Sequence, residues 1–154
     1  MTSPAPPVLV IGLGNAMRRD DGIGPAAIEL LERETLPAAD MIVLDGESTR
    51  LIEAWRGRSR AIVIDAVAAG SRAGTIHEVE VGTDALPDWD AGASTHGAGI
   101  AEAVALGRAL DRLPAELVVF GVEPDDLSHG PGLSPAVDAA LPLLVERVRR
   151  RVEA

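Results

Sequence analysis

Three polar side chains in this chain have the types and positions that metal or acid–base chemistry requires. Asp21 follows an apolar stretch and a glycine-rich turn, Asp65 ends a second apolar stretch, and His96 opens a predicted helix. Two carboxylates and one imidazole suit a divalent metal with open coordination positions, with Zn, Ni, Mn and Fe all compatible. Such a metal would polarise a carbonyl and lower the pKa of bound water. In a metal-free alternative, Asp21 and Asp65 share a proton as an acid–base pair.

Each of these side chains also has an ordinary structural explanation. Asp20 or Asp21 alone is more often a helix cap than a ligand, and a histidine in a glycine-rich helix start is more often a surface residue. Asp65 is harder to explain in this way, because Ala and Val follow it instead of turn-forming residues. The other histidines are weaker candidates, and His77, in an alternating strand pattern, is expected to face solvent.

The elements that must position these residues alternate between strand and helix. Strand-like patterns cover residues 8–12, 41–44, 60–65, 75–81 and 117–121. Helical patterns cover residues 25–34, 48–55 and 97–113, followed by a last helix with Ser134 as N-cap, Pro135 at its first position and a kink expected at Pro142. This order predicts an α/β fold, an open and mostly parallel five-stranded sheet with helices on both faces. The carboxyl ends of its parallel strands and the following helix N-termini share one edge, so Asp21, Asp65 and His96 are expected to converge there.

The amino-acid composition excludes several classes of catalytic site and of partner. The 154 residues are expected to form a single domain, residues 1–154. The chain has no cysteine or tyrosine, and all 14 basic residues are arginine, which excludes a cysteine nucleophile, a Schiff-base lysine, a thiolate metal site and a P-loop. A net charge of −10 argues against a nucleic-acid partner. No membrane-length apolar run or signal-like start is present, so we expect a protein that works in the cytoplasm, away from membranes. From its size and charge we expect a monomer.

Several short stretches, in order along nearly the whole chain, resemble the maturation endopeptidases of nickel–iron hydrogenases. They are IGLGN (11–15) with DDGIG (20–24), IDAV (64–67), STHGAG (94–99), and GVEP (121–124) followed by LSP (133–135). The resemblance implies a three-layer α/β/α sandwich of the phosphorylase/hydrolase-like type. It implies an endopeptidase that removes the C-terminal extension of the hydrogenase large-subunit precursor after nickel insertion.

Carried over to this chain, the family's metal-contacting and catalytic positions are Asp21, Asp65 and His96, although many members have Glu where this chain has Asp21. The resemblance also implies that the nickel belongs to the precursor and that no organic cofactor is needed. Gly14 and Asn15 in the first turn are expected to bind substrate. Trp89, with Leu86 in the loop 82–94, is expected to form a docking surface, unless this is an ordinary surface loop.

Two other functions compete with this interpretation. Peptidyl-tRNA hydrolases have a similar first strand ending in GLGN, but they continue with Pro-Gly and carry a histidine soon afterwards, whereas the first histidine here is His77. A non-catalytic metal- or nucleotide-binding module on a similar scaffold is the third possibility. The dinucleotide fingerprint itself fails, because Met17 stands where its third glycine should be.

Overall fold

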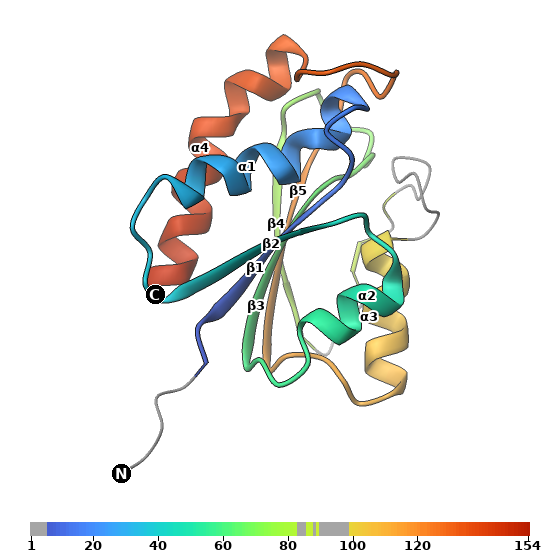
Figure 1. Cartoon of the computed structure of the whole chain (residues 1–154). Helices are drawn as coiled ribbons and strands as arrows, with labels where there is room; N and C mark the ends of the chain where they lie inside the picture. Colours follow the sequence, from blue (N-terminus) through green and yellow to red (C-terminus); the bar gives the residue numbers. More distant parts are fainter. Residues whose placement is uncertain (1–5, 83–85, 88, 90–98) are drawn as a thin grey trace.

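The computed structural model describes residues 6–82, 86–87, 89 and 99–154, which build one five-stranded sheet covered by helices (Figure 1). The strands lie in the order β2-β1-β3-β5-β4, with β4 antiparallel to β5 and the other neighbours parallel. The strands are β1 (Val8–Leu13), β2 (Ala39–Leu44), β3 (Arg60–Ala66), β4 (Ile76–Val81) and β5 (Glu116–Val122). The helices are η1 (Arg19–Gly22, a 3₁₀ turn), α1 (Ile23–Glu32), α2 (Ser48–Ala54), α3 (Gly99–Ala109) and α4 (Pro135–Glu153).

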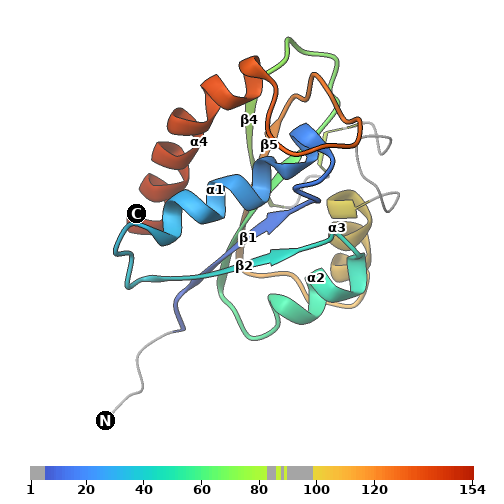
Figure 2. The ribbon, with the colours of Figure 1, turned by 45° about the horizontal axis from the view of Figure 1, so that its top comes forward.

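The helices form two layers, one on each face of the sheet (Figure 2). Helices α1 and α4 cover one face and α2 and α3 the other, so the sheet separates two apolar cores. Along the central strands β1, β3 and β5, successive side chains enter alternate cores, which explains why these strands are apolar almost throughout. The predicted three-layer α/β/α sandwich with a mostly parallel five-stranded sheet is therefore confirmed.

The element boundaries differ from the predictions in a few places. Helix α1 begins at Ile23, two residues before the predicted start, because η1 leads directly into it. Helix α3 ends at Ala109 and not at residue 113, and the chain after it has a positive φ at Asp111. Helix α4 is one continuous helix that includes Pro142. Among the described residues, no helix combines the length and the apolar character needed to cross a bilayer.

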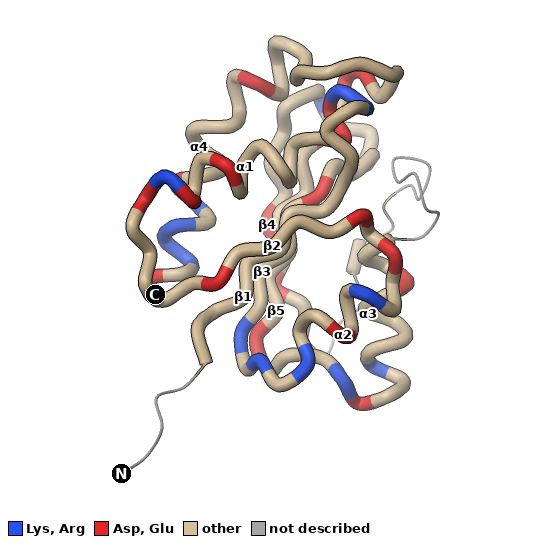
Figure 3. The backbone as a smooth tube through the Cα atoms, viewed as in Figure 1, with Lys and Arg blue, Asp and Glu red and all other residues tan. Residues whose placement is uncertain are grey.

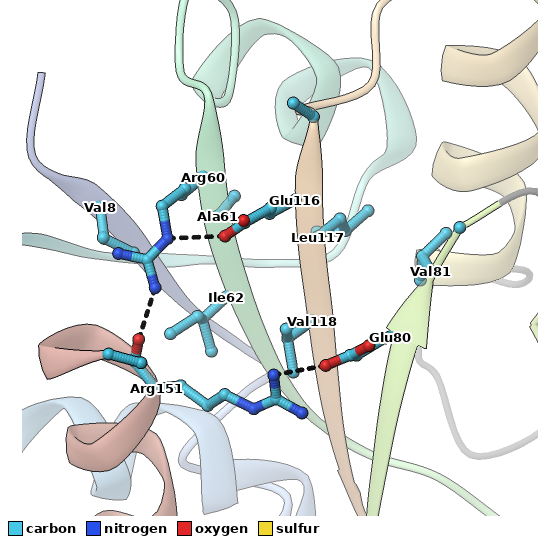
Figure 4. Close-up of a pocket in the computed structure, with 13 residues that line it drawn as sticks. Val8, Arg60, Ala61, Ile62, Glu80, Val81, Glu116, Leu117, Val118 and Arg151 are labelled. Atoms are coloured by element: carbon cyan, nitrogen blue, oxygen red, sulfur yellow. Dashed lines mark hydrogen bonds and ion pairs between the residues drawn. The ribbon is translucent and has the colours of Figure 1, made fainter. Parts of the chain in front are cut away.

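The edge of the sheet opposite the predicted site holds an arginine-rich region and a cavity. Arginines gather where β3 begins (Figure 3). A cavity of about 640 Å³ opens over the first residues of β1, β3 and β5 (Figure 4). Its charged rim is paired within the protein, Arg60 with Glu116 at 2.9 Å and Arg151 with Glu80 at 2.6 Å. Asp65 lies near the other end of β3, so this cavity is not part of the candidate site.

The crossing of β1 and α1 is so close that only glycine fits at Gly24. A Cβ there would overlap backbone atoms of Leu13 and approach the carbonyl oxygen of Ile64 to 2.8 Å. A Cβ at Gly107, in α3, would instead meet the end of the flexible Leu113 side chain at 2.9 Å. Moving backbone atoms costs more free energy than moving the end of a side chain. A larger residue should therefore be accommodated better at Gly107 than at Gly24.

We therefore expect Gly24→Ala and Gly107→Ala to affect stability differently, although alanine gains about 1 kcal/mol of helix propensity at both positions. Gly24→Ala should destabilise the fold by about 2 kcal/mol or more, because the overlap outweighs that gain. Gly107→Ala should stay within about 1 kcal/mol of the parent chain. Urea unfolding measures both, and equal midpoints for the two variants would contradict the packing argument.

Candidate functional site

The turn after β1 packs against η1, and this contact fixes Asp21. Gly14 has a φ of +131°, and a side chain at this position would overlap the carbonyl oxygen of Asp21. The Asn15 N–H donates to Asp21 Oδ2 at 2.9 Å, and Arg18 Nη1 lies 3.8 Å from the same oxygen. Asp21 is only 2% exposed. Gly14 and Asn15 thus position Asp21, while their contact with substrate stays a prediction.

Asp20 does not cap helix α1. The N-cap position of α1 is Gly22, and no side chain bonds to the helix start there. The fully buried Asp20 carboxylate instead accepts hydrogen bonds from the N–H groups of Asp125, Asp126 and Ser134 at 2.7–2.8 Å. The Ser134 hydroxyl donates a further bond at 2.8 Å. Ser134 is the N-cap residue of α4, as predicted, but its hydroxyl donates to Asp20 and makes no capping bond to the helix.

Asp65 lies near the carboxyl end of β3, in register with Gly121 of β5. Ala61 and Val63 enter the core under α2 and α3, so alternation points Asp65 to the same face. Burial, and after it the negative charge of Asp21, raises the pKa of Asp65 well above its ordinary value. The Ala66 N–H opposes this rise by donating to the carboxyl group. The two aspartates are therefore close enough to repel each other, as their predicted positions at one sheet edge require.

The third residue of the predicted site, His96, lies outside the described residues. Within the described part of the chain, no group of three or more His, Asp or Glu side chains is arranged to hold a metal ion. Asp21 and Asp65, two residues of the predicted ligand set, thus lie near each other, and the ligand role of all three residues stays a prediction.

Sequence reasoning missed Glu123, which directly follows β5 and is 5% exposed. Its carboxylate accepts hydrogen bonds from the N–H groups of Ala69 and Gly70, in the loop that follows β3. His77 lies beside it, with Nε2 at 3.6 Å from Glu123 Oε2. The side chain of His77 is only 24% exposed, so the expectation that it faces solvent is wrong. The signal for Glu123 was present in the sequence, since it is a charged residue at the end of an apolar strand, like Asp65.

The predicted docking loop 82–94 is described only in part. Leu86, Pro87 and Trp89 line a pocket of about 270 Å³ together with residues of α3, including Ala101 and Val104. The Trp89 ring also lies 6.2 Å from the imidazole of His77, tilted by 47°. Trp89 therefore stands between an apolar pocket and the His77–Glu123 pair.

The raised pKa of Asp65 predicts a pH-dependent stability. A folded-state pKa above the unfolded value gives stability that is fully present below about pH 4 and is lost as the pH rises through the folded pKa. We expect Asp65→Asn, which cannot ionise, to become more stable than the parent chain as the pH rises. The difference should grow from near zero below about pH 4 to at least about 1 kcal/mol at pH 8.

Denaturant unfolding of the metal-free protein across this pH range provides the measurement. Glu32→Gln, at an exposed position of α1, is the control and should follow the parent chain. An Asp65→Asn variant that is equally destabilised at all pH values would show that Asp65 is not buried in a repulsive environment.

Comparison with known proteins identifies the family. The family model for hydrogenase maturation proteases (HycI) matches residues 25–151. The hydrogenase expression/formation protein HupD of Thiocapsa roseopersicina is 32% identical over 155 residues, covering 92% of this chain and 69% of that protein. The hydrogenase 2 maturation protease of Escherichia coli K12 is 27% identical over 143 residues, covering 92% of this chain and 87% of that protein.

Solved structures give the same result for the fold. The hydrogenase maturating endopeptidase HybD from E. coli superimposes with a TM-score of 0.76 at 24% identity, over 92% of this chain and 89% of that one. The family match favours the protease over the peptidyl-tRNA hydrolase and the non-catalytic module. With its paired aspartates at the carboxyl edge of the sheet, this chain belongs to the hydrogenase maturation protease family and is a peptidase.

Proposed function

We propose that this protein is the endopeptidase that removes the C-terminal extension from a nickel-loaded [NiFe] hydrogenase large-subunit precursor. The observation that carries the proposal is the pair of buried carboxyls in a maturation-protease fold, with Asp21 in η1, after β1, and Asp65 near the end of the neighbouring strand β3. The nickel is part of the substrate and serves as the recognition signal. Asp21, Asp65 and His96 are the residues that would contact it.

The donor set fits this metal. Carboxylate oxygens and an imidazole are ligands that Ni(II) accepts. Asp21 and Asp65 repel each other when both are ionised, and a divalent cation between them would offset this repulsion. Two carboxylates and one imidazole, with no thiolate, form an open site of three weak ligands, which supports delivery of the nickel by the precursor.

The chain's own groups supply the proton transfers. Bound nickel would polarise a carbonyl and lower the pKa of water, and Asp21 or Asp65 then acts as the base. In the metal-free alternative, the environments of the two aspartates assign different roles. Asp65 is kept towards its neutral form and acts as the acid. Asp21, bonded by the Asn15 N–H and beside Arg18, has contacts that stabilise a negative charge and acts as the base.

The test is the intact mass of a precursor after incubation with this protein, in nickel-loaded and nickel-free forms. We expect loss of the C-terminal extension only from the loaded form. Asp21→Asn, Asp65→Asn and His96→Ala should each lower the cleavage rate by roughly 100-fold or more. Asp45→Asn is the matched control, because Asp45 also follows a strand of this sheet but accepts its bonds from Glu47 and Arg50 at the start of α2.

The outcomes separate the parts of the proposal. Equal cleavage of loaded and nickel-free precursor would contradict nickel recognition while keeping the peptidase activity. Cleavage at the parent rate by both Asp21→Asn and His96→Ala would remove them from the site. Sedimentation of the protein alone tests the expected monomer.

We further propose that the pocket formed by Leu86, Pro87, Trp89 and α3 docks the precursor, with Gly14 and Asn15 contacting the peptide near Asp21. An apolar pocket beside a catalytic edge suits an apolar side chain of a partner protein. Trp89→Ala should raise KM for the loaded precursor about tenfold and leave kcat unchanged, because only binding area is lost. A fall in kcat at constant KM would assign Trp89 to the catalytic geometry instead.

A further inference from the structure

We propose that Glu123 is a positioning residue for Asp65: its carboxylate holds the loop that leaves β3 and thereby orients the catalytic carboxyl. This inference rests on the proposed role of Asp65. Glu123 is a buried acidic residue with no role in the proposed reaction itself, and the inference gives it one.

Glu123 is fixed at the end of β5 by its backbone. Its N–H donates to the carbonyl oxygen of Thr75 at 2.9 Å, and its carbonyl oxygen accepts from the Gly74 N–H at 2.8 Å. From this position the side chain reaches back to the Ala69 N–H, at 2.9 Å from Oε2, and the Gly70 N–H, at 3.0 Å from Oε1. A single side chain thus satisfies two consecutive N–H groups of the loop.

Only a few residues separate these bonds from Asp65. Asp65 is the last residue but one of β3, and the N–H of Val67, two residues later, donates to the carbonyl oxygen of Val122 at 3.0 Å. The segment 66–70 is therefore held to β5 at Val67, beside Asp65, and to Glu123 at its end. Loss of the second attachment would free the loop and with it the packing of Val67 beside Asp65, so the carboxyl would lose its fixed orientation.

A glycine in β5, Gly121, leaves space on the sheet for the start of the loop after β3. Asp65 and His77 both lie in register with Gly121, one on each side of it. A side chain at Gly121 would overlap Val67, so the glycine lets this first loop residue pack on the sheet. The loop thus fits the surface between Asp65 and His77.

The second contact of Glu123 connects it to the docking pocket. His77 Nε2 is buried without a hydrogen-bond partner among the described residues, 3.6 Å from Glu123 Oε2. The Trp89 ring lies 6.2 Å from the same imidazole, tilted by 47°. Glu123 therefore lies between the segment that orients Asp65 and the residues proposed to bind the precursor.

The experiment compares Glu123→Gln with Glu47→Gln. Glu47 is a matched control, because its carboxylate also accepts two consecutive backbone N–H groups, those of Thr49 and Arg50, but at the start of α2. We expect Glu123→Gln to lower kcat for the loaded precursor roughly ten- to hundredfold with KM within about twofold of the parent value. Glu47→Gln should keep the parent kcat. Glu123→Ala, which has no acceptor at all, should fall below Glu123→Gln.

Two measurements without substrate accompany the kinetics. In Glu123→Gln, amide exchange of Ala69 and Gly70 should accelerate, and the ¹³Cγ resonance of Asp65 should shift; neither should change in Glu47→Gln. Parent values of kcat and of the Asp65 resonance in Glu123→Gln would overturn the inference, as would an equal kcat loss in Glu47→Gln. If the parent chain fails to cleave any loaded precursor, the proposed function fails, and the resonance and exchange data still decide whether Glu123 positions Asp65.

Discussion

The edge of the sheet that carries Asp21 and Asp65 depends on one buried group, the carboxylate of Asp20. Burying an ionised carboxylate costs several kcal/mol unless hydrogen bonds replace its water. Here four donors do so, all from Asp125, Asp126 and Ser134, more than 100 positions later in the chain. Because charge-assisted bonds to backbone N–H groups are short and directional, they fix the turn that carries Asp21 against the loop before α4.

Backbone contacts add a second constraint around the same turn. Gly14 is packed against the carbonyl oxygen of Asp21, and Gly24 against the backbone of Leu13. The backbone is strained at Arg19, at the start of η1, because this non-glycine residue has a φ of +45°. Its N–H donates to the carbonyl oxygen of Gly130, so the same loop that binds Asp20 also holds the strained residue. The turn is thus determined by its neighbours and not by its own conformational preferences.

The candidate site contains two buried acidic groups whose repulsion lowers the stability of the fold. Asp65 is buried beside the negative charge of Asp21, and a neutral side chain would fit its surroundings at lower cost. The two apolar cores on either side of the sheet supply the stability that such a pair requires. The pair is a local conflict within an otherwise consistent fold, and such conflicts are typical of functional positions.

The sequence by itself determined the α/β/α architecture, because apolar runs of strand length and 3.6-residue periodicity are local patterns. It also placed Asp21 and Asp65 at one edge, since parallel strands bring their carboxyl ends together. Only the tertiary structure showed that Asp20 binds a distant loop and that Glu123 holds the loop after β3. Both carboxylates are bonded to residues more than 50 positions away in the sequence. Hydrogen bonds over such separations leave no periodic signal, because their partners are backbone N–H groups that every residue except proline provides.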